Sequence, residues 1–293
     1  MTSAPLTRDD SRPNPQKRNI LLNRLVKAPW WLLVIALFVV GFAINASQSQ
    51  VYRNVWREVR QGIWITLWVT VVAYLFAMVF GLLIAMMRRS NNFFIYQIST
   101  VYVEFVRGIP TLVLVYYVVL ALTPMVVNGL NDMGNWLVAN GITQGAVLAD
   151  LRTRDIPNTA RAIFGLAISY SAFLSEVFRA GIDSIGQGQR EAALSLGMTR
   201  WQVMRYIVLP QAFRVVLPPL GNDFIAMLKE SSLVSIVGVE DITRQGSTTA
   251  QSNFVFFQAY NVVALTYLVL TLTLSMLVKG LEGYLDRGKA RDT

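Results

Sequence analysis

The chain alternates long apolar runs that carry no charge with short segments that contain Lys or Arg. No Asp, Glu, Lys or Arg occurs in residues 28–52 or in residues 61–87. A helix needs about 20 mostly apolar residues to cross the hydrocarbon core of a bilayer. The pattern therefore predicts a first span near Trp30–Asn45 and a second over about Ile63–Met87.

Three later apolar runs predict further helices: Phe93–Leu122, Thr159–Arg179 and Phe254–Val278. Pro110 lies inside the first of these runs and predicts either a kink or the start of a new helix. A weaker candidate, Gln211–Leu228, contains two adjacent prolines, so hydropathy alone would not select it as a span. The mixed segment Thr123–Pro157 is expected to be an extracytoplasmic loop with short helices.

The chain is thus predicted to be an all-α, polytopic membrane protein with five clear transmembrane helices, or about six if the weak candidate Gln211–Leu228 is also a span. Of its 293 residues 54% are hydrophobic, more than an ordinary soluble domain uses. The predicted organisation is a disordered basic tail over 1–27, an extra N-terminal span over 28–55, a transmembrane domain over 56–283 and a C-terminal tail over 284–293.

The charge distribution sets the expected topology. The chain has 26 basic and 17 acidic residues, a net charge of +9. A basic balance also suits nucleic acid binding, but Lys and Arg adjoin the apolar runs, so the positive-inside rule is the simpler account. Both termini are then cytoplasmic. The first outer segment breaks the rule, because it holds Arg53, Arg57 and Arg60 against a single acid, Glu58.

The residue types exclude several kinds of chemistry. The chain has no Cys and no His, so it can form no disulfide, thiolate nucleophile, Ser-His-Asp triad or histidine zinc site. It also lacks the phosphate-binding sequence GxxxxGK(S/T). We expect no catalysis and no cofactor on this chain, and any ATP that drives it would be bound by a partner subunit.

The segment Gln189–Pro210 is predicted to be a positively charged helix–turn–helix. Glu191 lies near the start of the first helix, where the helix dipole favours an acid. Gly197 can end that helix in a left-handed conformation, and Thr199 can cap a second helix that stops near Pro210. Taken alone, such a segment is also compatible with an amphipathic loop at the membrane interface.

The full spacing of this segment resembles the cytoplasmic coupling motif of ABC importer permeases. That motif is Glu-Ala-Ala, three residues, Gly, nine residues and Ile-x-Leu-Pro, and every fixed position is present. The coupling residues, with Gln189 before them, are Gln189, Glu191, Ala192, Ala193, Gly197, Ile207, Leu209 and Pro210. The two alanines are small, so a partner surface can approach closely.

Flanking sequences narrow the resemblance to the polar amino acid permease family, the histidine/glutamine type. They are YVEFVRGIPTLVL from Tyr102, SAFLSEVFRAGIDSIGQGQ from Ser171 and PQAFRVVLPPLGNDFIAMLKESSLVSI from Pro210. The resemblance covers roughly residues 60–280. The family usually has Thr, Tyr, Gly and Thr at four positions that are here Ile109, Phe173, Ala180 and Ser231.

The resemblance implies a type I ABC importer permease, with a core of five transmembrane helices besides the N-terminal span. It requires Gln211–Leu228 to be one of these five, which gives about six spans in all. Cytoplasmic ATPase subunits would dock on the coupling helix at 189–206, and a second permease, identical or homologous, would complete the pathway. A substrate-binding protein would dock on the other side, on Thr123–Pro157 and Asp241–Ser252. The expected substrate is a polar L-amino acid and the expected location is the bacterial cytoplasmic (inner) membrane.

Charged and polar residues within the apolar runs are candidates for the substrate path or its gating. Glu176 and Arg179 lie three residues apart and can pair on one helix face, and Glu104 and Arg107 repeat this spacing. The segment Lys229–Ser232 is either an unwound polar break beside the path or a solvated helix end. The whole set is Glu104, Arg107, Glu176, Arg179, Asn222, Asp223, Lys229, Ser231 and Ser232.

Two other classes fit parts of the sequence. A self-sufficient secondary transporter or channel would use the buried carboxylates and an ion gradient, but it leaves the coupling motif unexplained. A membrane anchor for a signalling ATPase would use the motif without transporting anything. The sequence names neither the amino acid carried nor the partner permease.

Overall fold

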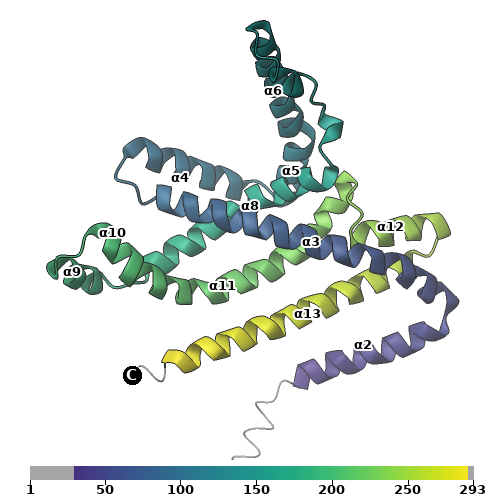
Figure 1. The fold of residues 1–293 in the computed structure, drawn as a ribbon. Coiled ribbons are helices and arrows are strands. Elements are labelled where there is room, and N and C mark those ends of the chain that lie inside the picture. Colours follow the sequence, from purple (N-terminus) through teal and green to yellow (C-terminus); the bar gives the residue numbers. More distant parts are fainter. Residues whose placement is uncertain (1–29, 290–293) are drawn as a thin grey trace, which may run out of the picture. The chain divides into compact units, whose positions relative to one another are not determined.

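A computed structural model describes residues 30–289, and within them every regular element is a helix (Figure 1). The chain divides into two compact units, Met1–Gln50 and Val51–Thr293. The described helix of the first unit is α2, Trp30–Gln48, which has no charged residue and begins where the first span was predicted. The predicted basic tail over 1–27 lies outside the described residues.

The next helix, α3, is unusually long. It spans Gln50–Met87, 38 residues, so the predicted outer segment between the first two spans is helical. Val55 and Val59, one turn apart, are buried in a cluster with residues of α12, Ile242–Asn253, and α13, Phe256–Lys289. This packing stabilises the first turns of α3 beyond its apolar run.

Pro110 begins a new helix, which was one of the two predicted alternatives. Helix α4, Phe93–Gly108, starts where the Asn92 side chain accepts the N–H of Phe94 at 2.9 Å, and it ends before an extended residue, Ile109. The chain then continues as α5, Thr111–Tyr116, the π-helix η1, Tyr117–Leu122, and α6, Thr123–Ala139. The helix with spanning length is therefore Thr111–Ala139 and not Phe93–Leu122.

Helix α6 also replaces much of the predicted loop Thr123–Pro157. It packs against α7, Gly145–Ala149, and the short 3-10 helix η2, Thr153–Asp155. The amide of Asn131 donates to the carbonyls of Ala149 and Leu151 at 2.7 and 2.9 Å, which fixes this hairpin. We call Thr123–Asp155 the α6–α7 hairpin.

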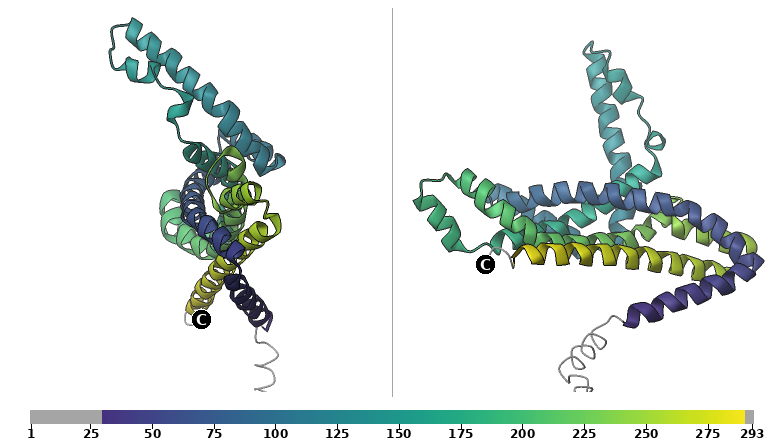
Figure 2. Two further views of the ribbon diagram at one scale, coloured as in Figure 1. Left: turned by 90° about the vertical axis from the view of Figure 1, so that its right-hand side faces the viewer. Right: turned by 60° about the horizontal axis from the view of Figure 1, so that its bottom comes forward.

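The remaining helices follow in chain order. They are α8 (Asn158–Asp183), α9 (Gln187–Ser195), α10 (Arg200–Gln202), the π-helix η3 (Val203–Val208), α11 (Leu209–Glu230) and the 3-10 helix η4 (Ser231–Val237), which precedes α12 and α13. Helix α13 continues to Lys289, into the predicted C-terminal tail. Helices α8, α11 and α13 lie side by side, with α11 in contact with both others (Figures 1 and 2).

Among the described residues, four helices are long and apolar enough to cross a membrane: Gln50–Met87, Thr111–Ala139, Asn158–Asp183 and Phe256–Gly283. The apolar part of α2, Leu33–Gln48, is shorter, and α11 is not in this set, as its prolines and charges led us to expect. The polytopic, all-helical fold class is confirmed, while the count of six spans stays approximate.

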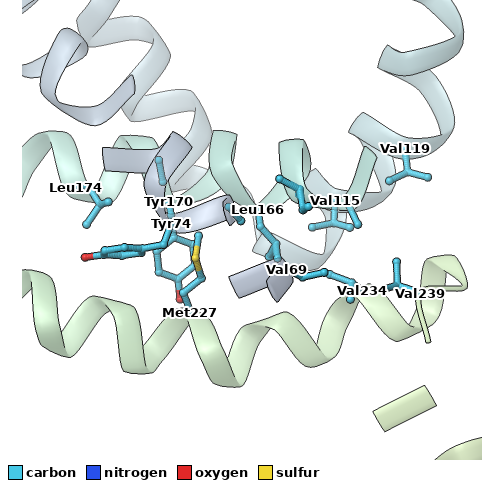
Figure 3. Packing of buried hydrophobic residues seen from close by; sticks show 14 of the residues in the cluster. Val69, Tyr74, Val115, Val119, Leu166, Tyr170, Leu174, Met227, Val234 and Val239 are labelled. Carbon is cyan, nitrogen blue, oxygen red and sulfur yellow. The ribbon is translucent and has the colours of Figure 1, made fainter. Parts of the chain in front are cut away.

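The main core lies where α3, α8 and α11 meet, with α5, η1 and η4 at one end. Figure 3 shows Val69 and Tyr74 of α3 packed with Leu166 and Tyr170 of α8 and with Met227 of α11. Prolines 218 and 219 lie within α11. The core therefore ties the helix that follows the coupling motif to two of the long apolar helices.

Candidate coupling and translocation sites

The turn after α9 has the local structure that its glycine predicts. Gly197 has a φ of +82°, in the left-handed region. Its N–H donates to the carbonyl of Leu194 at 2.9 Å, and the N–H of Met198 donates to the carbonyl of Ala193 at 3.2 Å. This pair of bonds is a Schellman motif, and Met198 packs against the buried cluster that contains Ala193, a contact that often accompanies the motif.

The second helix begins as predicted but does not stop at Pro210. The Thr199 hydroxyl accepts the N–H of Gln202 at 3.3 Å, while the Gln202 side chain accepts the N–H of Thr199 at 2.8 Å, a reciprocal capping box. The chain then forms η3 and enters α11 without a break. The predicted stop is wrong because the π-helical turn, in which Leu209 donates to the carbonyl of Met204, accommodates a proline that has no N–H.

The same device precedes Pro124. There Thr123 donates its N–H to the carbonyl of Val118, again five residues back, at the end of the π-helix η1. Each π-helix is thus followed by a single residue and then a proline, and in both places the chain continues as an α-helix through that proline.

The inner side of the coupling segment is anchored to α8 and α11. Ala193 is buried with Ile182 at the end of α8 and with Ala212 of α11. We had expected this alanine to face a partner, but it faces the protein's own core. The Gln211 amide donates to the Gln189 side chain at 2.7 Å. The Arg190 guanidinium donates to the carbonyl of Ile182. A push on α9 would therefore reach both α8 and α11.

The outer side of the segment is exposed and partly apolar. Glu191, Ala192 and Gly197 are exposed, and the Leu196 side chain is 84% exposed beside them. Trp201, at the start of the second helix, is 66% exposed. Of the predicted coupling residues, Ile207 and Leu209 are half-buried and Pro210 is exposed.

Glu176 is the centre of a charged cluster. Its carboxylate accepts two bonds from Arg179, at 2.7 and 2.9 Å, which confirms the predicted pair. It also accepts a hydrogen bond from Arg88, next to the end of α3, and lies 3.7 Å from Arg107 of α4. Arg88 is 9% exposed. One carboxylate thus joins three helices.

The predicted pairing of Glu104 with Arg107 is not found among the described ion pairs. Arg107 pairs with Glu176 instead and lies 5.8 Å from the centre of the Phe173 ring, while Glu104 is exposed. Next to this cluster, Arg89 pairs with Asp183. Sequence spacing did not point to Arg88 and Arg89 as partners of these acids, because the helices that carry them are far apart in the chain.

Polar groups gather at the far end of α11. Ser231 is buried and Ser232 half-buried, while Asn222 and Lys229 are exposed. Helix α11 ends at Glu230 and continues as the tighter 3-10 helix η4, so the segment changes its helical geometry here but stays helical.

Glu230, which we did not select from the sequence, has a buried carboxylate oxygen with no hydrogen-bond partner among residues 30–289. Tyr170 of α8 interacts electrostatically with Glu230 and with the half-buried Asp223. The hydroxyl of Tyr74 donates to the carbonyl of Leu220 at 2.6 Å on the same side. Two carboxylates and two tyrosines therefore lie together within the α3–α8–α11 core.

A groove leads away from this region toward the coupling segment. Its volume is ≈ 750 Å³ and its walls come from α3, α8, η3 and α11. Leu220, Met78 and Phe178 are among the apolar residues that line the groove. Arg205 and Arg214 also line it and add positive charge. The groove has an almost wholly apolar lining otherwise.

The start of α12 is fixed by a buried acid outside the spanning helices. Asp241 caps α12 by accepting the N–H of Arg244 at 2.8 Å, and it also accepts the Tyr267 hydroxyl at 3.2 Å. Burial raises the pKa of the Asp241 carboxyl to about 6. Gly62 of α3 lies against the Asp241 backbone, where an added Cβ would come within 2.5 Å.

These features define a class: a polytopic, all-helical membrane protein with a helix–turn–helix outside its spanning helices. A family model described as "Binding-protein-dependent transport system inner membrane component" matches residues 77–291. The chain belongs to this family. Membership in this family implies that the chain assembles with an ATPase, an extracytoplasmic binding protein and permease partners. It also implies that the chain crosses the inner membrane several times.

Similar proteins agree with this placement. The chain is 36% identical over 200 residues to the "Probable amino-acid permease protein YxeN" of Bacillus subtilis (strain 168), covering 67% of this chain and 77% of that protein. It is 36% identical over 202 residues to the "Glutamine transport system permease protein GlnP" of Escherichia coli (strain K12), covering 69% and 81%.

Solved structures show the same fold. One described as an "amino acid ABC transporter with histidines" aligns with a TM-score of 0.63 and 35% identity, covering 78% of this chain and 94% of that one. The "MetNI methionine ABC transporter" in an inward-facing conformation aligns with a TM-score of 0.59 and 18% identity, which supports the fold alone.

Proposed function

We propose that this chain is the permease subunit of an ATP-driven ABC importer for polar L-amino acids. It forms half of the translocation pathway with a second permease, identical or homologous, in the bacterial inner membrane with both termini in the cytoplasm. The chain binds no cofactor and hydrolyses nothing, because partner ATPase subunits bind the ATP. The amino-acid permeases among its relatives support this substrate class.

The observation that carries the proposal is the two-sided coupling segment. Its exposed side offers Glu191, Ala192 and Leu196 to a partner, and its other side is bound to α8 and α11 through Ala193 and the Gln189–Gln211 hydrogen bond. A closing ATPase dimer that pushes the exposed side would move both helices as one body. A free interfacial loop needs neither anchor.

The region where α8 and α11 meet α3 then serves as the substrate path. Tyr170, Asp223 and Glu230 lie at one end of α11, and the apolar groove runs from Leu220 to the coupling segment. Buried carboxylates within a membrane protein favour the ammonium group of an amino acid. The serines that begin the 3-10 helix η4, Ser231 and Ser232, add hydroxyls and backbone groups for its carboxylate.

The cluster around Glu176 has a gating role in this proposal. It joins the ends of α3 and α4 to α8, the helix that leads to the coupling segment. If α8 moves relative to α3 or α4, these ion pairs must either break or move together with the helices that they join. Arg107 and Arg179, 42% and 43% exposed, have room to exchange partners.

A site-specific cross-link tests the docking surface. The natural chain has no cysteine, so Leu196→Cys introduces a unique thiol at the exposed turn. In membranes that contain the co-expressed ATPase, a short thiol–amine cross-linker is expected to join this position to the ATPase. Val147→Cys, 77% exposed on the α6–α7 hairpin, is the matched control and should give no such product. Cross-linking at neither position, or equally at both, contradicts the proposed docking.

A further inference from the structure

The exposed face of α3 changes character in regular steps along its length. Seven exposed residues, each three or four positions after the one before, lie on this face of the helix. They are, in order, Arg53, Arg57, Arg60, Trp64, Trp68, Val71 and Leu75. The face therefore runs from three arginines through two tryptophans to aliphatic residues.

The opposite face of the same helix is buried. Val55, Val59, Thr66 and Val69 are at most 1% exposed and pack against the cores of the second unit. The arginine–tryptophan face is thus fixed outward by packing on the other side. Trp64 is 72% exposed and Trp68 is 53% exposed, values that suit side chains in contact with lipid.

The spacing along α3 sets the depth of each residue in a bilayer. Arg60 and Arg88 bracket the charge-free run of α3, and at 1.5 Å per residue they lie about 42 Å apart along the axis. A bilayer with its headgroup regions is about 40–45 Å thick. When Arg88 lies at one headgroup region, Arg60 therefore lies at the other, with Trp64 about 6 Å deeper and Arg57 about 4.5 Å farther out.

Two arginines of this face, Arg57 and Arg60, are not paired with an acid of the described residues. Glu58, the single acid within α3, accepts a hydrogen bond from Gln61 at 3.2 Å. Three arginines on the outer side also run against the positive-inside distribution of the rest of the chain.

We propose that Arg57 and Arg60, above Trp64, bind the phosphate headgroup of an anionic phospholipid in the leaflet opposite the coupling segment. A guanidinium offers paired N–H donors that match phosphate oxygens. The Trp64 ring lies at the interface directly below and packs along the start of the acyl chains. A headgroup at this depth is the occupant favoured by the position of Arg60, since a soluble partner would have to reach to the level of the phosphates.

Lipid-dependent tryptophan quenching tests the site in the assembled transporter. The complex is placed in phosphatidylcholine vesicles that contain either brominated phosphatidylglycerol or brominated phosphatidylcholine. The signal of Trp64 is the difference in quenching between the wild type and Trp64→Phe. We expect brominated phosphatidylglycerol to associate several-fold more tightly than brominated phosphatidylcholine, and less so as salt is raised.

Substitutions of Arg57 and Arg60 then test whether these two arginines cause the preference for phosphatidylglycerol. Arg57→Gln with Arg60→Gln should lower the relative affinity for phosphatidylglycerol by about fivefold per arginine removed. Arg57→Lys with Arg60→Lys keeps the charge and should retain most of the preference. Arg152→Gln with Arg154→Gln removes two exposed arginines from the α6–α7 hairpin and should leave the Trp64 signal unchanged.

Three results would overturn the proposal. One is equal association of both lipids at Trp64 in the wild type. Another is an equal loss of preference in the hairpin control. The third is a loss of substrate-binding-protein affinity in pure phosphatidylcholine vesicles on removal of Arg57 and Arg60, which would assign these arginines to protein docking.

Discussion

Replacement of Gly197 should uncouple ATP hydrolysis from transport through backbone conformation alone. Gly197 has a φ of +82°, and a Cβ at this position would meet no atom within 4 Å. Steric clash with neighbours is therefore absent, and the effect of a substitution comes from the left-handed conformation. For an L-residue this conformation costs about 1–2 kcal/mol, more for a β-branched one and less for Asn.

The expected magnitude follows from that strain. A cost of about 2 kcal/mol shifts the equilibrium of the turn about 30-fold away from the Schellman geometry. The assay is the amount of amino acid taken up per ATP hydrolysed in vesicles that contain the whole transporter. Gly197→Val should lower this ratio about tenfold or more, Gly197→Ala less, and Gly197→Asn by no more than about twofold.

The chain supplies a closely matched control. Gly141 also has a φ of +82°, and a Cβ added to it would meet no atom within 4 Å. It also belongs to a Schellman motif, in which the N–H of Gly141 donates to the carbonyl of Val138 and the N–H of Ile142 donates to the carbonyl of Leu137. It lies in the α6–α7 hairpin, away from the coupling segment. Gly141→Val should therefore impose the same strain and leave the ratio unchanged. If both valine variants lower the ratio equally, or neither does, the reasoning about the coupling turn is refuted.

Three further predictions concern stability, measured as thermal unfolding of the purified complex. Glu176→Gln leaves partly buried arginines without their acid and should cost about 3 kcal/mol, whereas Asp183→Asn, at a more exposed pair, should cost less than about 1 kcal/mol; equal costs would contradict the central role of Glu176. Gly62→Ala would place a Cβ 2.5 Å from backbone atoms of α12 and should cost about 1–3 kcal/mol or more, while Gly41→Ala, with nothing within 4 Å, should not destabilise. The pKa of Asp241 is raised from 3.8 to about 6, so its contribution is complete below about pH 4 and is lost, by up to about 3 kcal/mol, as pH rises through 6; Asp241→Asn should abolish this dependence, and an unchanged pH profile in that variant would contradict the assignment.

Local chemistry made the coupling turn predictable from sequence. The end of α9 at Gly197 and the capping box of Thr199 depend on residues within one or two turns of each other, and both were found where predicted. The start of a helix after Pro110 is local in the same sense. Charge-free runs likewise located α2 and the apolar part of α3.

Features that depend on packing between distant segments were missed. Spacing on α4 predicted that Arg107 would pair with Glu104, but α8 brings Glu176 closer. Ala193 was expected to face a partner, and contacts with α8 and α11 bury it instead. The continuation of the helix through Pro210 needs a π-helical turn, and no residue type in Val203–Val208 marks that geometry. The extension of α3 beyond its apolar run depends on α12 and α13, which lie almost 200 residues later.

Uptake into vesicles tests the central claim most directly. The wild-type transporter with its ATPase is compared with the Gly197→Val variant under ATP alone and under an imposed ion gradient alone. An ATP-driven importer predicts amino acid uptake that requires ATP, ignores the gradient and is lost in the variant. Uptake that follows the gradient and is indifferent both to ATP and to Gly197 would contradict the account and identify a secondary transporter.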